Sequence, residues 1–337
     1  MNCNQIKPIR LDFPLLFHMI QDYQLVERIG KGSFGKVWKA VRKTDGKVVA
    51  LKMIDYSKMS RPEKQLIINE INILKKINND HVVKYLDRVN DQEKHILHLI
   101  MEYCPGGDLE HLITKTKISN DYIREEQIWL SLGELALALK DCHCAPEKIL
   151  HRDIKPGNIF INEEGHVKLG DFGLAKKIDT DYTKTYLGTP YYMCPEINKK
   201  SKYNEECDIW ALGCVIYQMA ALEPPFRGCR EEQLRMNILY SPITRFSTKH
   251  YSDSLWNIVS WMLEKDPKKR PTVMQILEYR NVALTLQTSK VMKQLNCIRQ
   301  KRTLLSEKYE KLKENEAKLD HQSDNQGLHH NENIENI

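Results

Sequence analysis

A short segment of the chain, ILHRDIKPGNIF at positions 149–160, brings an acid, two cations and an amide together. Asp153 follows Arg152 directly, Lys155 comes two residues after it and Asn158 five residues after it. Apolar pairs at both ends of the segment predict a loop that buried flanks hold in place. In such a loop, Asp153 can accept the proton of an attacking hydroxyl. Lys155 can neutralise charge on a migrating phosphoryl group. Together with a phosphate-binding segment elsewhere in the chain, these residue types would suit phosphoryl transfer.

A second acid, Asp171, lies thirteen residues after Asn158 in the segment VKLGDFGLAKK. Two strand-like runs with a turn at positions 163–165 separate the two residues, so we expect the chain to double back and bring them to one place. Amide and carboxylate oxygens suit Mg²⁺, which takes its other ligands from water and substrate phosphates. Asn158 and Asp171 are therefore the predicted metal ligands.

The segment GKGSFGKV at positions 30–37 matches the pattern Gly-x-Gly-x-x-Gly, which by itself is weak evidence. In a dinucleotide-binding fold this pattern opens a helix, whereas here it runs into residues that alternate like strands. We therefore expect a flap between two strands, with backbone N–H groups facing phosphate oxygens. A glycine-rich hairpin without a ligand is the alternative. The candidate nucleotide-binding residues of this flap are Ile29, Gly30, Lys31, Gly32, Ser33, Phe34, Gly35, Lys36 and Val37.

A lysine in the next predicted strand needs an anionic partner. Val48, Ala50 and Lys52 share one face of that strand, so Lys52 points with apolar neighbours toward the space beneath the flap. A lysine in such surroundings keeps its charge only beside an anion. Glu70 falls within the apolar stripe of the following helix, and we predict a Lys52–Glu70 pair that orients phosphates. A purely structural salt bridge is the alternative reading.

The pattern of elements predicts an α+β chain with two lobes. Three strands cover residues 23–55, a capping box starts a helix at residues 60–63, and two more strands cover 82–89 and 95–102. Helical patterns follow at 125–143, 208–222 and 255–263. A small lobe rich in strands therefore precedes a larger helical lobe, and residues 104–107 join them.

The composition changes after about residue 280. Five apolar residues recur there at every seventh position: Val291, Ile298, Leu305, Leu312 and Leu319. The seven-residue repeat predicts a helix over residues 281–320. Arg302 and Glu316 interrupt the second apolar seam that a coiled coil needs. The helix is therefore either a homodimeric coiled coil through residues 291–319 or a lone amphipathic helix. The polar residues 321–337 are predicted to be disordered.

The overall composition limits the classes of partner. The chain has 337 residues, 51 basic and 45 acidic, and no Lys/Arg run dense enough to indicate nucleic-acid binding. Nine irregularly spaced cysteines favour ordinary thiols in a reducing compartment. No apolar run approaches the roughly 18 residues of a membrane span, and the N-terminus lacks the features of a signal peptide. We therefore expect no nucleic-acid or membrane partner, and a cytoplasmic or nuclear location.

The ordered motifs resemble those of the eukaryotic protein-kinase family. These motifs are G-x-G-x-x-G-x-V, A-L-K, a helical glutamate, H-R-D-I-K-P-G-N, D-F-G and C-P-E. The likeness covers residues 23–280 and implies a bilobal kinase fold, preceded by an N-terminal extension over residues 1–22. Cys194 departs from the family pattern, because it stands where alanine is usual.

The resemblance implies ATP as cofactor with Mg²⁺, or alternatively Mn²⁺. Lys155 together with the segment GTPYY resembles the serine/threonine type, which implies protein substrates. Structural roles are implied for Asp208 and for a Glu196–Arg270 pair. Adenine contacts are implied at the hinge (Glu102, Cys104), above and below the ring (Val37, Ala50, Phe160) and at the back of the pocket (Met101).

The residues between the D-F-G and C-P-E motifs resemble an activation loop. Arg152 needs an anion, and Lys176 supplies a second cation five residues past Asp171. We predict that phosphorylated Thr185 binds Arg152 and Lys176 and orders this loop. Thr189 is expected to contact Asp153 as a neutral hydroxyl. The alternative is that none of these threonines is modified.

Within the kinases, the chain resembles the NIMA-related family. The segments that carry the likeness are MEYCPGGDLEHLI, GHVKLGDFGLAK, LGTPYYMCPE and YNEECDIWALGCVIYQMAALEPPF. The leucine seam is similar to that of the centrosomal leucine-zipper members. The resemblance to the family implies a role in the regulation of the cell cycle, the centrosome or basal body, or microtubules. A catalytically weak scaffold that acts through the coiled coil is the alternative. A small-molecule phosphotransferase is disfavoured by the segment GTPYYMCPE.

Overall fold

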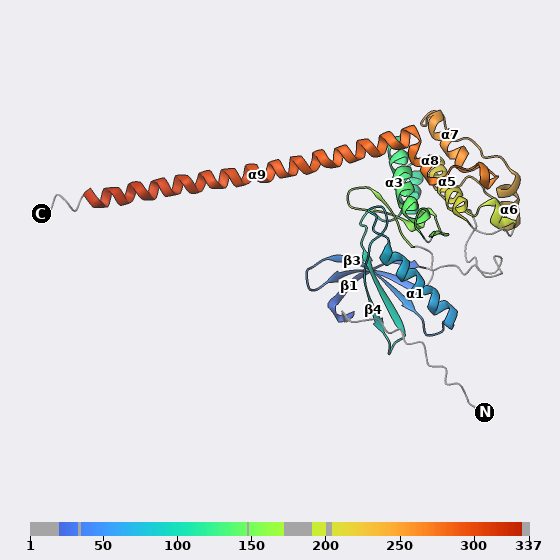
Figure 1. Cartoon of the computed structure of the whole chain (residues 1–337), viewed down its shortest axis with the longest axis horizontal. Coiled ribbons are helices and arrows are strands. Elements are labelled where there is room, and N and C mark those ends of the chain that lie inside the picture. Colours follow the sequence, from blue (N-terminus) through green and yellow to red (C-terminus); the bar gives the residue numbers. More distant parts are fainter. Residues whose placement is uncertain (1–19, 33–34, 147, 172–190, 200–203, 332–337) are drawn as a thin grey trace, which may run out of the picture. The chain divides into compact units, whose positions relative to one another are not determined.

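A computed structural model describes residues 20–32, 35–146, 148–171, 191–199 and 204–331, without the side chains of residues 31, 66, 69, 70, 73 and 314–331. The chain divides into two units, residues 1–282 and 283–337, which are described separately. Figure 1 labels their elements. No helix of the described ranges is both long and apolar enough to cross a bilayer.

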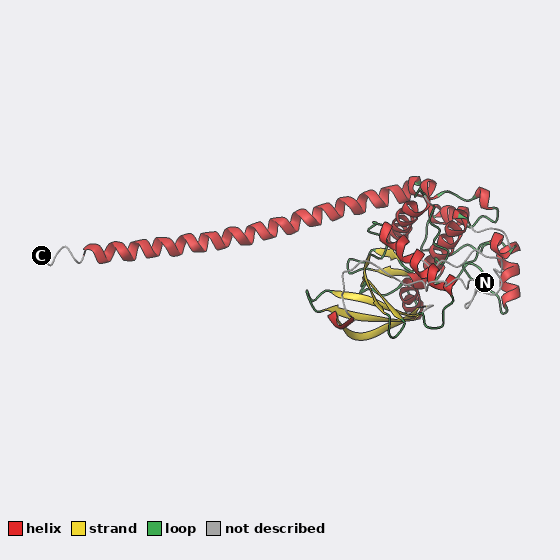
Figure 2. Ribbon diagram, turned by 60° about the horizontal axis from the view of Figure 1, so that its bottom comes forward, coloured by secondary structure: helices red, strands yellow, loops and turns green. Residues whose placement is uncertain are grey.

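The strands of the first lobe are yellow in Figure 2. They form a five-stranded antiparallel sheet with the order β1-β2-β3-β5-β4. The alternating residues form the strands because each side of the sheet buries one set of apolar side chains. A turn with Gly46 at φ +71° joins β2 to β3. The strands, after a short 3₁₀ turn η1 (Ile20–Asp22), are β1 (Tyr23–Gly32), β2 (Gly35–Arg42), β3 (Val48–Asp55), β4 (Tyr85–Asp91) and β5 (Ile96–Glu102).

Helix α1 (Arg61–Lys76) begins at the predicted capping box. The Glu63 carboxylate accepts hydrogen bonds from the Ser60 backbone N–H at 2.6 Å and from its hydroxyl at 2.7 Å. Ile67 and Ile71 bury the inner face of the helix in a cluster with residues of β3 and β5. The sheet therefore gains a cover, and the predicted start of this helix is confirmed.

The second lobe is mainly helical, and a two-stranded sheet, β6 (Ile159–Ile161) and β7 (Val167–Leu169), lies within it. Helix α3 has the predicted bounds, and α5 is buried around its whole circumference, as expected for a central helix. The helices are α2 (Leu109–Ile118), α3 (Glu125–His143), α4 (Pro195–Asn198), α5 (Glu205–Ala221), α6 (Glu231–Tyr240), α7 (Asp253–Met262) and α8 (Val273–Glu278), with 3₁₀ turns η2 (Pro156–Asn158) and η3 (Pro267–Lys269).

The predicted fold class is confirmed, because a five-stranded sheet with one covering helix is followed by a helical lobe. Helix α5 begins at Glu205 rather than at Asp208. Asn204 is the N-cap, although its side chain makes no capping hydrogen bond, and the acidic residues Glu205, Glu206 and Asp208 of the first turn favour the earlier start.

Helix α9 (Arg280–Asn331) contains nearly all of the second unit (Figure 1). It continues through residues 321–331, which lie in the segment for which the sequence predicts disorder, and that prediction stays untested. Those residues contain one glycine and no proline, and each residue added to an existing helix gains a backbone hydrogen bond. On the predicted seam, Val291, Ile298, Leu305 and Leu312 are all exposed.

Candidate active site

Lys52 lies in the middle of β3 and is only 4% exposed. Its neighbours across the sheet are Val37 on β2 and Leu99 on β5. The Lys52 ammonium forms an ion pair with the carboxylate of Asp171, which compensates for the burial of the charge. Glu70 lies on α1, but its side chain is outside the described part of the chain. The Lys52–Glu70 pair therefore stays a prediction.

The glycine flap connects β1 and β2, with Gly32 opposite Gly35 and Gly30 opposite Val37. A Cβ atom on Gly35 would lie 1.6 Å from the Met53 carbonyl oxygen, so the packing of β2 on β3 excludes any side chain there. A Cβ atom on Gly30 would make only an ordinary contact with Val37, at 3.8 Å. Two of the predicted flap residues, at positions 33 and 34, lie outside the described residues.

Asp153 receives hydrogen bonds from both of its predicted neighbours. Its Oδ2 atom accepts one from Lys155 Nζ at 2.8 Å and one from Asn158 Nδ2 at 2.8 Å. Asn158 Nδ2 also donates to the Asp153 carbonyl oxygen at 2.8 Å. The Asp153 side chain is 21% exposed, so a substrate hydroxyl can reach the carboxylate. The loop therefore presents an acid whose orientation its own neighbours fix.

The buried carboxylate of Asp208, in the first turn of α5, holds the backbone of this loop in place. It accepts hydrogen bonds from the backbone N–H groups of His151 at 2.9 Å and Arg152 at 3.0 Å, and it lies 2.9 Å from His143 Nε2. Arg152 adopts φ +65°, a left-handed conformation that costs energy for a residue with a side chain. The contacts to Asp208 compensate for that strain.

His151 links the loop to the D-F-G segment, a role that the sequence analysis missed. Its Nδ1 atom accepts from the Asp153 N–H at 3.3 Å, and Nε2 lies 3.1 Å from the Gly170 carbonyl oxygen. Burial lowers the pKa of His151, although Asp208 and Asp153 act in the opposite direction. A neutral ring with the proton on Nε2 satisfies both contacts. The only sequence signal was its position in the H-R-D motif.

The predicted metal ligands lie at adjoining positions. Gly170 N donates to the Asn158 carbonyl oxygen at 2.9 Å, and Asp171 follows Gly170 directly. The Asn158 amide nitrogen faces Asp153, which directs its amide oxygen away from that carboxylate. An amide oxygen and a carboxylate are hard donors, so this set fits Mg²⁺ or Mn²⁺.

Glu102, the last residue of β5, has a partner that the sequence analysis missed. Its carboxylate forms an ion pair with the buried ammonium of Lys168 at 2.9 Å and accepts a hydrogen bond from Lys84 N at 3.1 Å. A lysine between Val167 and Leu169 in a short apolar strand was the available signal. Burial, aided by Glu102, raises the pKa of Cys104 to about 11, so the thiol at this position stays protonated at neutral pH.

Phe160 and Gly170 fit together closely at the base of the site. A Cβ atom on Gly170 would lie 2.6 Å from Phe160 Cε2 and 3.0 Å from Val83 Cγ2. Ala50, buried on β3, pairs across the sheet with Met101 on β5. These residues occupy the sheet and strand positions from which the resemblance implied adenine contacts.

The predicted phosphorylation switch lies mostly outside the described residues. Thr185, Thr189 and Lys176 fall between residues 172 and 190, so nothing in the structure bears on their contacts. Arg152, the third member of that prediction, is described and partly buried.

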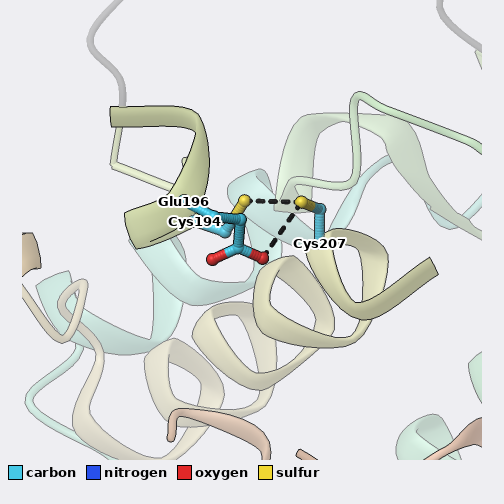
Figure 3. Close-up of side chains that lie close together, drawn as sticks. All are labelled: Cys194, Glu196 and Cys207. Carbon is cyan, nitrogen blue, oxygen red and sulfur yellow. Dashed lines mark hydrogen bonds between the residues drawn. The ribbon is translucent and has the colours of Figure 1, made fainter. Parts of the chain in front are cut away.

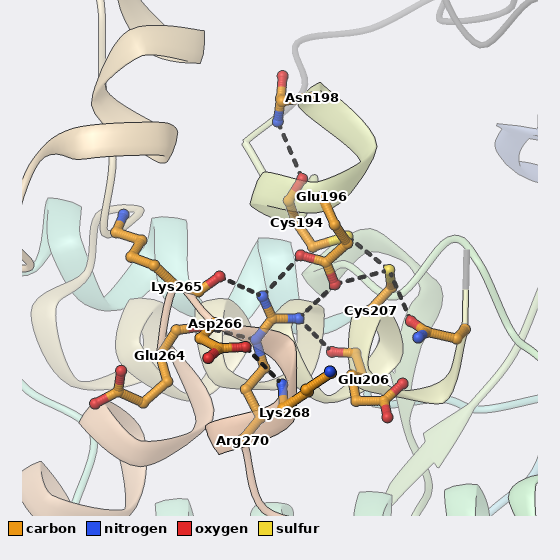
Figure 4. Close-up of polar contacts among 11 residues, drawn as sticks. Cys194, Glu196, Asn198, Glu206, Cys207, Glu264, Lys265, Asp266, Lys268 and Arg270 are labelled. Atoms are coloured by element: carbon orange, nitrogen blue, oxygen red, sulfur yellow. Dashed lines mark hydrogen bonds and ion pairs between the residues drawn. The ribbon is translucent and has the colours of Figure 1, made fainter. Parts of the chain in front are cut away.

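The Glu196–Arg270 pair anchors the C-P-E segment on the helical lobe (Figure 4). Two parallel bonds of 2.7 and 2.8 Å join the carboxylate to the guanidinium. The guanidinium also donates to the carbonyl oxygens of Glu206 and Glu264. Burial raises the pKa of Glu196, but the bonds from Arg270 outweigh it and hold that pKa below its usual value. The pair is therefore charged and fully engaged at neutral pH.

Comparison with known proteins agrees with this arrangement. Residues 23–281 match the protein kinase domain. The chain is 44% identical over 277 residues to the "Probable serine/threonine-protein kinase nek2" of Dictyostelium discoideum. The aligned region covers 81% of this chain and 65% of the relative. The chain is 42% identical over 263 residues to "Serine/threonine-protein kinase Nek2" of Homo sapiens, covering 77% and 59%. It is 38% identical over 284 residues to "G2-specific protein kinase nimA" of Emericella nidulans, covering 76% and 40%. The chain thus spans less than two thirds of the length of these curated relatives.

Proposed function

Because the chain belongs to the protein kinase family, in its NIMA-related branch, we propose that it is a serine/threonine protein kinase that transfers the γ-phosphate of ATP to protein hydroxyls. The observation that carries the proposal is the meeting of three segments. Lys52 from β3 pairs with Asp171, and Asp171 adjoins the loop in which Asp153 is oriented. Relatives named serine/threonine kinases support the proposed class of acceptor.

In the proposed reaction, Lys52 binds the phosphates of ATP, and Asn158 and Asp171 hold Mg²⁺ or Mn²⁺. The ion supplies charge neutralisation at the transferred phosphate. Asp153 orients the acceptor hydroxyl and takes its proton. Lys155, bonded to the same carboxylate, lies where it can offset charge on the phosphoryl group.

Positioning accounts for most of the expected rate enhancement, as in phosphoryl transfer generally. Asp208 fixes the backbone on the N-terminal side of Asp153, and Asn158 holds its C-terminal side. His151 ties the same loop to Gly170, next to Asp171. The proton acceptor and the metal ligands are therefore held by one connected set of hydrogen bonds.

The adenine ring is proposed to lie between Val37 and Ala50 above and Phe160 below, with hydrogen bonds to the backbone of Glu102 and Cys104. The Glu102–Lys168 ion pair supports this hinge, because it fixes the last residue of β5 against β7.

Regulation is proposed at the activation loop and at α1. Phosphorylated Thr185 would bind Arg152 and Lys176, and Glu70 would pair with Lys52 in the active arrangement. The phosphate would lie beside the catalytic loop, and the Glu70 carboxylate would lie beside the lysine that is proposed to bind ATP.

The kinase domain is proposed to cover residues 23–280, and α9 to dimerise the protein through residues 291–319. The exposed seam of Val291, Ile298, Leu305 and Leu312 supports dimerisation, because a second helix would cover it. By analogy with relatives named G2-specific kinases, a cell-cycle role is proposed, at the centrosome, at the basal body or in the nucleus. The same seam is the feature that favours the scaffold as second candidate.

The decisive experiment measures ³²P transfer from ATP to casein and to a peptide array by the purified full chain with Mg²⁺. We expect Asp153→Asn to lower the rate by about 10²–10⁴-fold, because the hydroxyl loses its proton acceptor. Asp121→Asn, in the loop between α2 and α3, is the matched control and should keep the full rate. A wild-type chain without transfer, or an Asp153→Asn variant at the full rate, contradicts the proposal and favours the scaffold.

A further inference from the structure

Two cysteines and a glutamate form a buried cluster between α4 and α5 (Figure 3). Cys194 is 2% exposed and is the N-cap of α4, whereas Cys207 is 1% exposed and lies in the first turn of α5. Their Sγ atoms are 2.7 Å apart, and Cys207 Sγ is 3.2 Å from Glu196 Oε1. The proposed phosphoryl transfer uses none of these thiols.

The distance between the two sulfur atoms shows whether the pair is better suited to bind a metal ion or to form a disulfide. Two thiolates on one tetrahedral zinc ion, with bonds of about 2.3 Å, lie about 3.8 Å apart. Sulfur atoms in a disulfide lie about 2.05 Å apart. Cys194 and Cys207, at 2.7 Å, are closer together than a shared ion requires. Their approach favours a bond between the two sulfurs.

The surroundings of the glutamate also argue against a cation. Both carboxylate oxygens of Glu196 are bonded to Arg270 (Figure 4). A metal ion at the thiols would lie near the guanidinium, which repels it, and would compete for an oxygen already engaged. The glutamate therefore acts as the partner of Arg270, and the two thiols are left to react with each other.

We propose that Cys194 and Cys207 are a redox modification site, which hydrogen peroxide converts into an intramolecular disulfide and a dithiol reductant restores. One thiolate attacks the peroxide oxygen and becomes a sulfenic acid, releasing water once the leaving oxygen is protonated. The second thiol displaces a second water from the sulfenic acid and forms the S–S bond. Two hydrogens leave the protein, and one peroxide is reduced to two waters. A dithiol reductant reverses the reaction.

The environment of the pair sets the rate of this reaction. The hydrogen bond with Cys194, followed by burial, raises the pKa of Cys207, and nearby Glu196 acts in the same direction. Thiolate is therefore scarce in the folded protein, and because the two side chains are only 2% and 1% exposed, peroxide reaches them only when the packing around them opens. Oxidation is slow, and the buried disulfide resists reduction until the protein opens again.

The disulfide would link the C-P-E segment to α5 directly. The closed loop contains Glu196, so the link holds that residue near Arg270 even when the ion pair opens. By closing the loop between Cys194 and Cys207, the disulfide also lowers the conformational entropy of the unfolded chain. The oxidised protein should therefore melt at a temperature several degrees higher than the reduced protein. This inference does not depend on whether the chain transfers phosphate.

The test uses the purified full chain, treated with hydrogen peroxide or with dithiothreitol, then alkylated and digested with trypsin. Lysines 199, 200 and 202 lie between the two cysteines, so the disulfide joins two separate peptides, residues 185–199 and 203–227. We expect this linked pair, about 2 Da lighter than the sum of its parts, only after peroxide. Fragmentation assigns the bond to Cys207 or to Cys214, which lies in the same peptide.

Matched variants give the controls. Cys207→Ser and Cys194→Ala should each abolish the linked peptides and the rise in melting temperature, whereas Cys214→Ser should keep both. The proposal fails if peroxide yields no linked pair, if the bond maps to Cys214, or if native mass spectrometry finds a metal ion that both cysteines are needed to retain. The linked pair can be read in the wild-type chain even if a variant does not fold.

Discussion

The candidate active site and the Glu196–Arg270 pair both contain ion pairs, but the side chains of the two regions differ in their exposure to solvent. In the active site, the Asp171 and Asp153 side chains are 27% and 21% exposed. In the Glu196–Arg270 pair, the Arg270 side chain is fully buried and that of Glu196 is 10% exposed. The two active-site carboxylates, which are proposed to act on a substrate and a metal ion, keep access to solvent, whereas Lys52 beside Asp171 is only 4% exposed. Groups that only hold the fold are fully engaged with one another.

This difference predicts which property each region controls. Removing one member of a buried pair leaves a buried charge without compensation, which mainly costs stability. Removing the partly exposed Asp153 carboxylate mainly costs function, because water can solvate its partner Lys155, whose side chain is 38% exposed.

The largest effect on stability is expected from Glu196→Ala. Because Arg270 would then be buried without its partner, the free energy of unfolding should fall by about 3–5 kcal/mol. The exposed pair Lys148–Glu205, at 2.5 Å, supplies the control. Glu205→Ala should cost less than about 1 kcal/mol. Urea denaturation monitored by tryptophan fluorescence measures both changes in the free energy of unfolding. Equal losses would show that the burial of an ion pair does not decide its contribution to stability.

A smaller effect is expected from Gly170→Ala, at the base of the active site. The new Cβ atom would collide with the Phe160 ring, so the free energy of unfolding should fall by about 1–3 kcal/mol. Phe160→Leu in the same chain should restore part of the loss by making room. Gly157→Ala is the control, because nothing lies within 4 Å of its added atom. Urea denaturation compares the four chains, and an undiminished loss in the double variant would contradict the steric cause.

The smallest effect is expected from pH. Burial holds the pKa of folded His151 below its usual 6.5, so below about pH 6.5 the unfolded chain binds a proton that the folded chain does not. Stability should therefore fall as the pH drops from 7.5 to 5.5. The Glu196–Arg270 pair should not contribute in this range, because the pKa of Glu196 lies below its usual 4.5.

Melting temperatures measured across this range test the sign. His151→Gln should have a shallower slope than the wild-type chain, but a slope should remain, because burial also lowers the pKa of His81 and His98. Glu196→Gln should keep the full slope. A slope that disappears in Glu196→Gln would mean that the Glu196–Arg270 pair titrates in this range.

The fold class, the capping box of α1, the bounds of α3 and the order of the motifs could all be predicted from the amino-acid sequence. Each of these depends on residues close together in the chain: the alternation in strands, the Ser60–Glu63 spacing, or the fixed offsets from Asp153 to Lys155 and Asn158. Local spacing decides such features because the backbone geometry of a strand, a helical turn or a short loop fixes which side chains meet.

The contacts between residues far apart in the chain could be identified only from the folded structure. The Lys52–Asp171 contact joins residues 119 positions apart, the Lys168–Glu102 pair spans 66, and the Cys194–Cys207 approach spans 13 across two helices. No local rule selects these partners, because each buried charge or thiol could be satisfied by several residues of the right type. The packing of the strands and helices places one of them within reach, and that choice depends on the whole core at once.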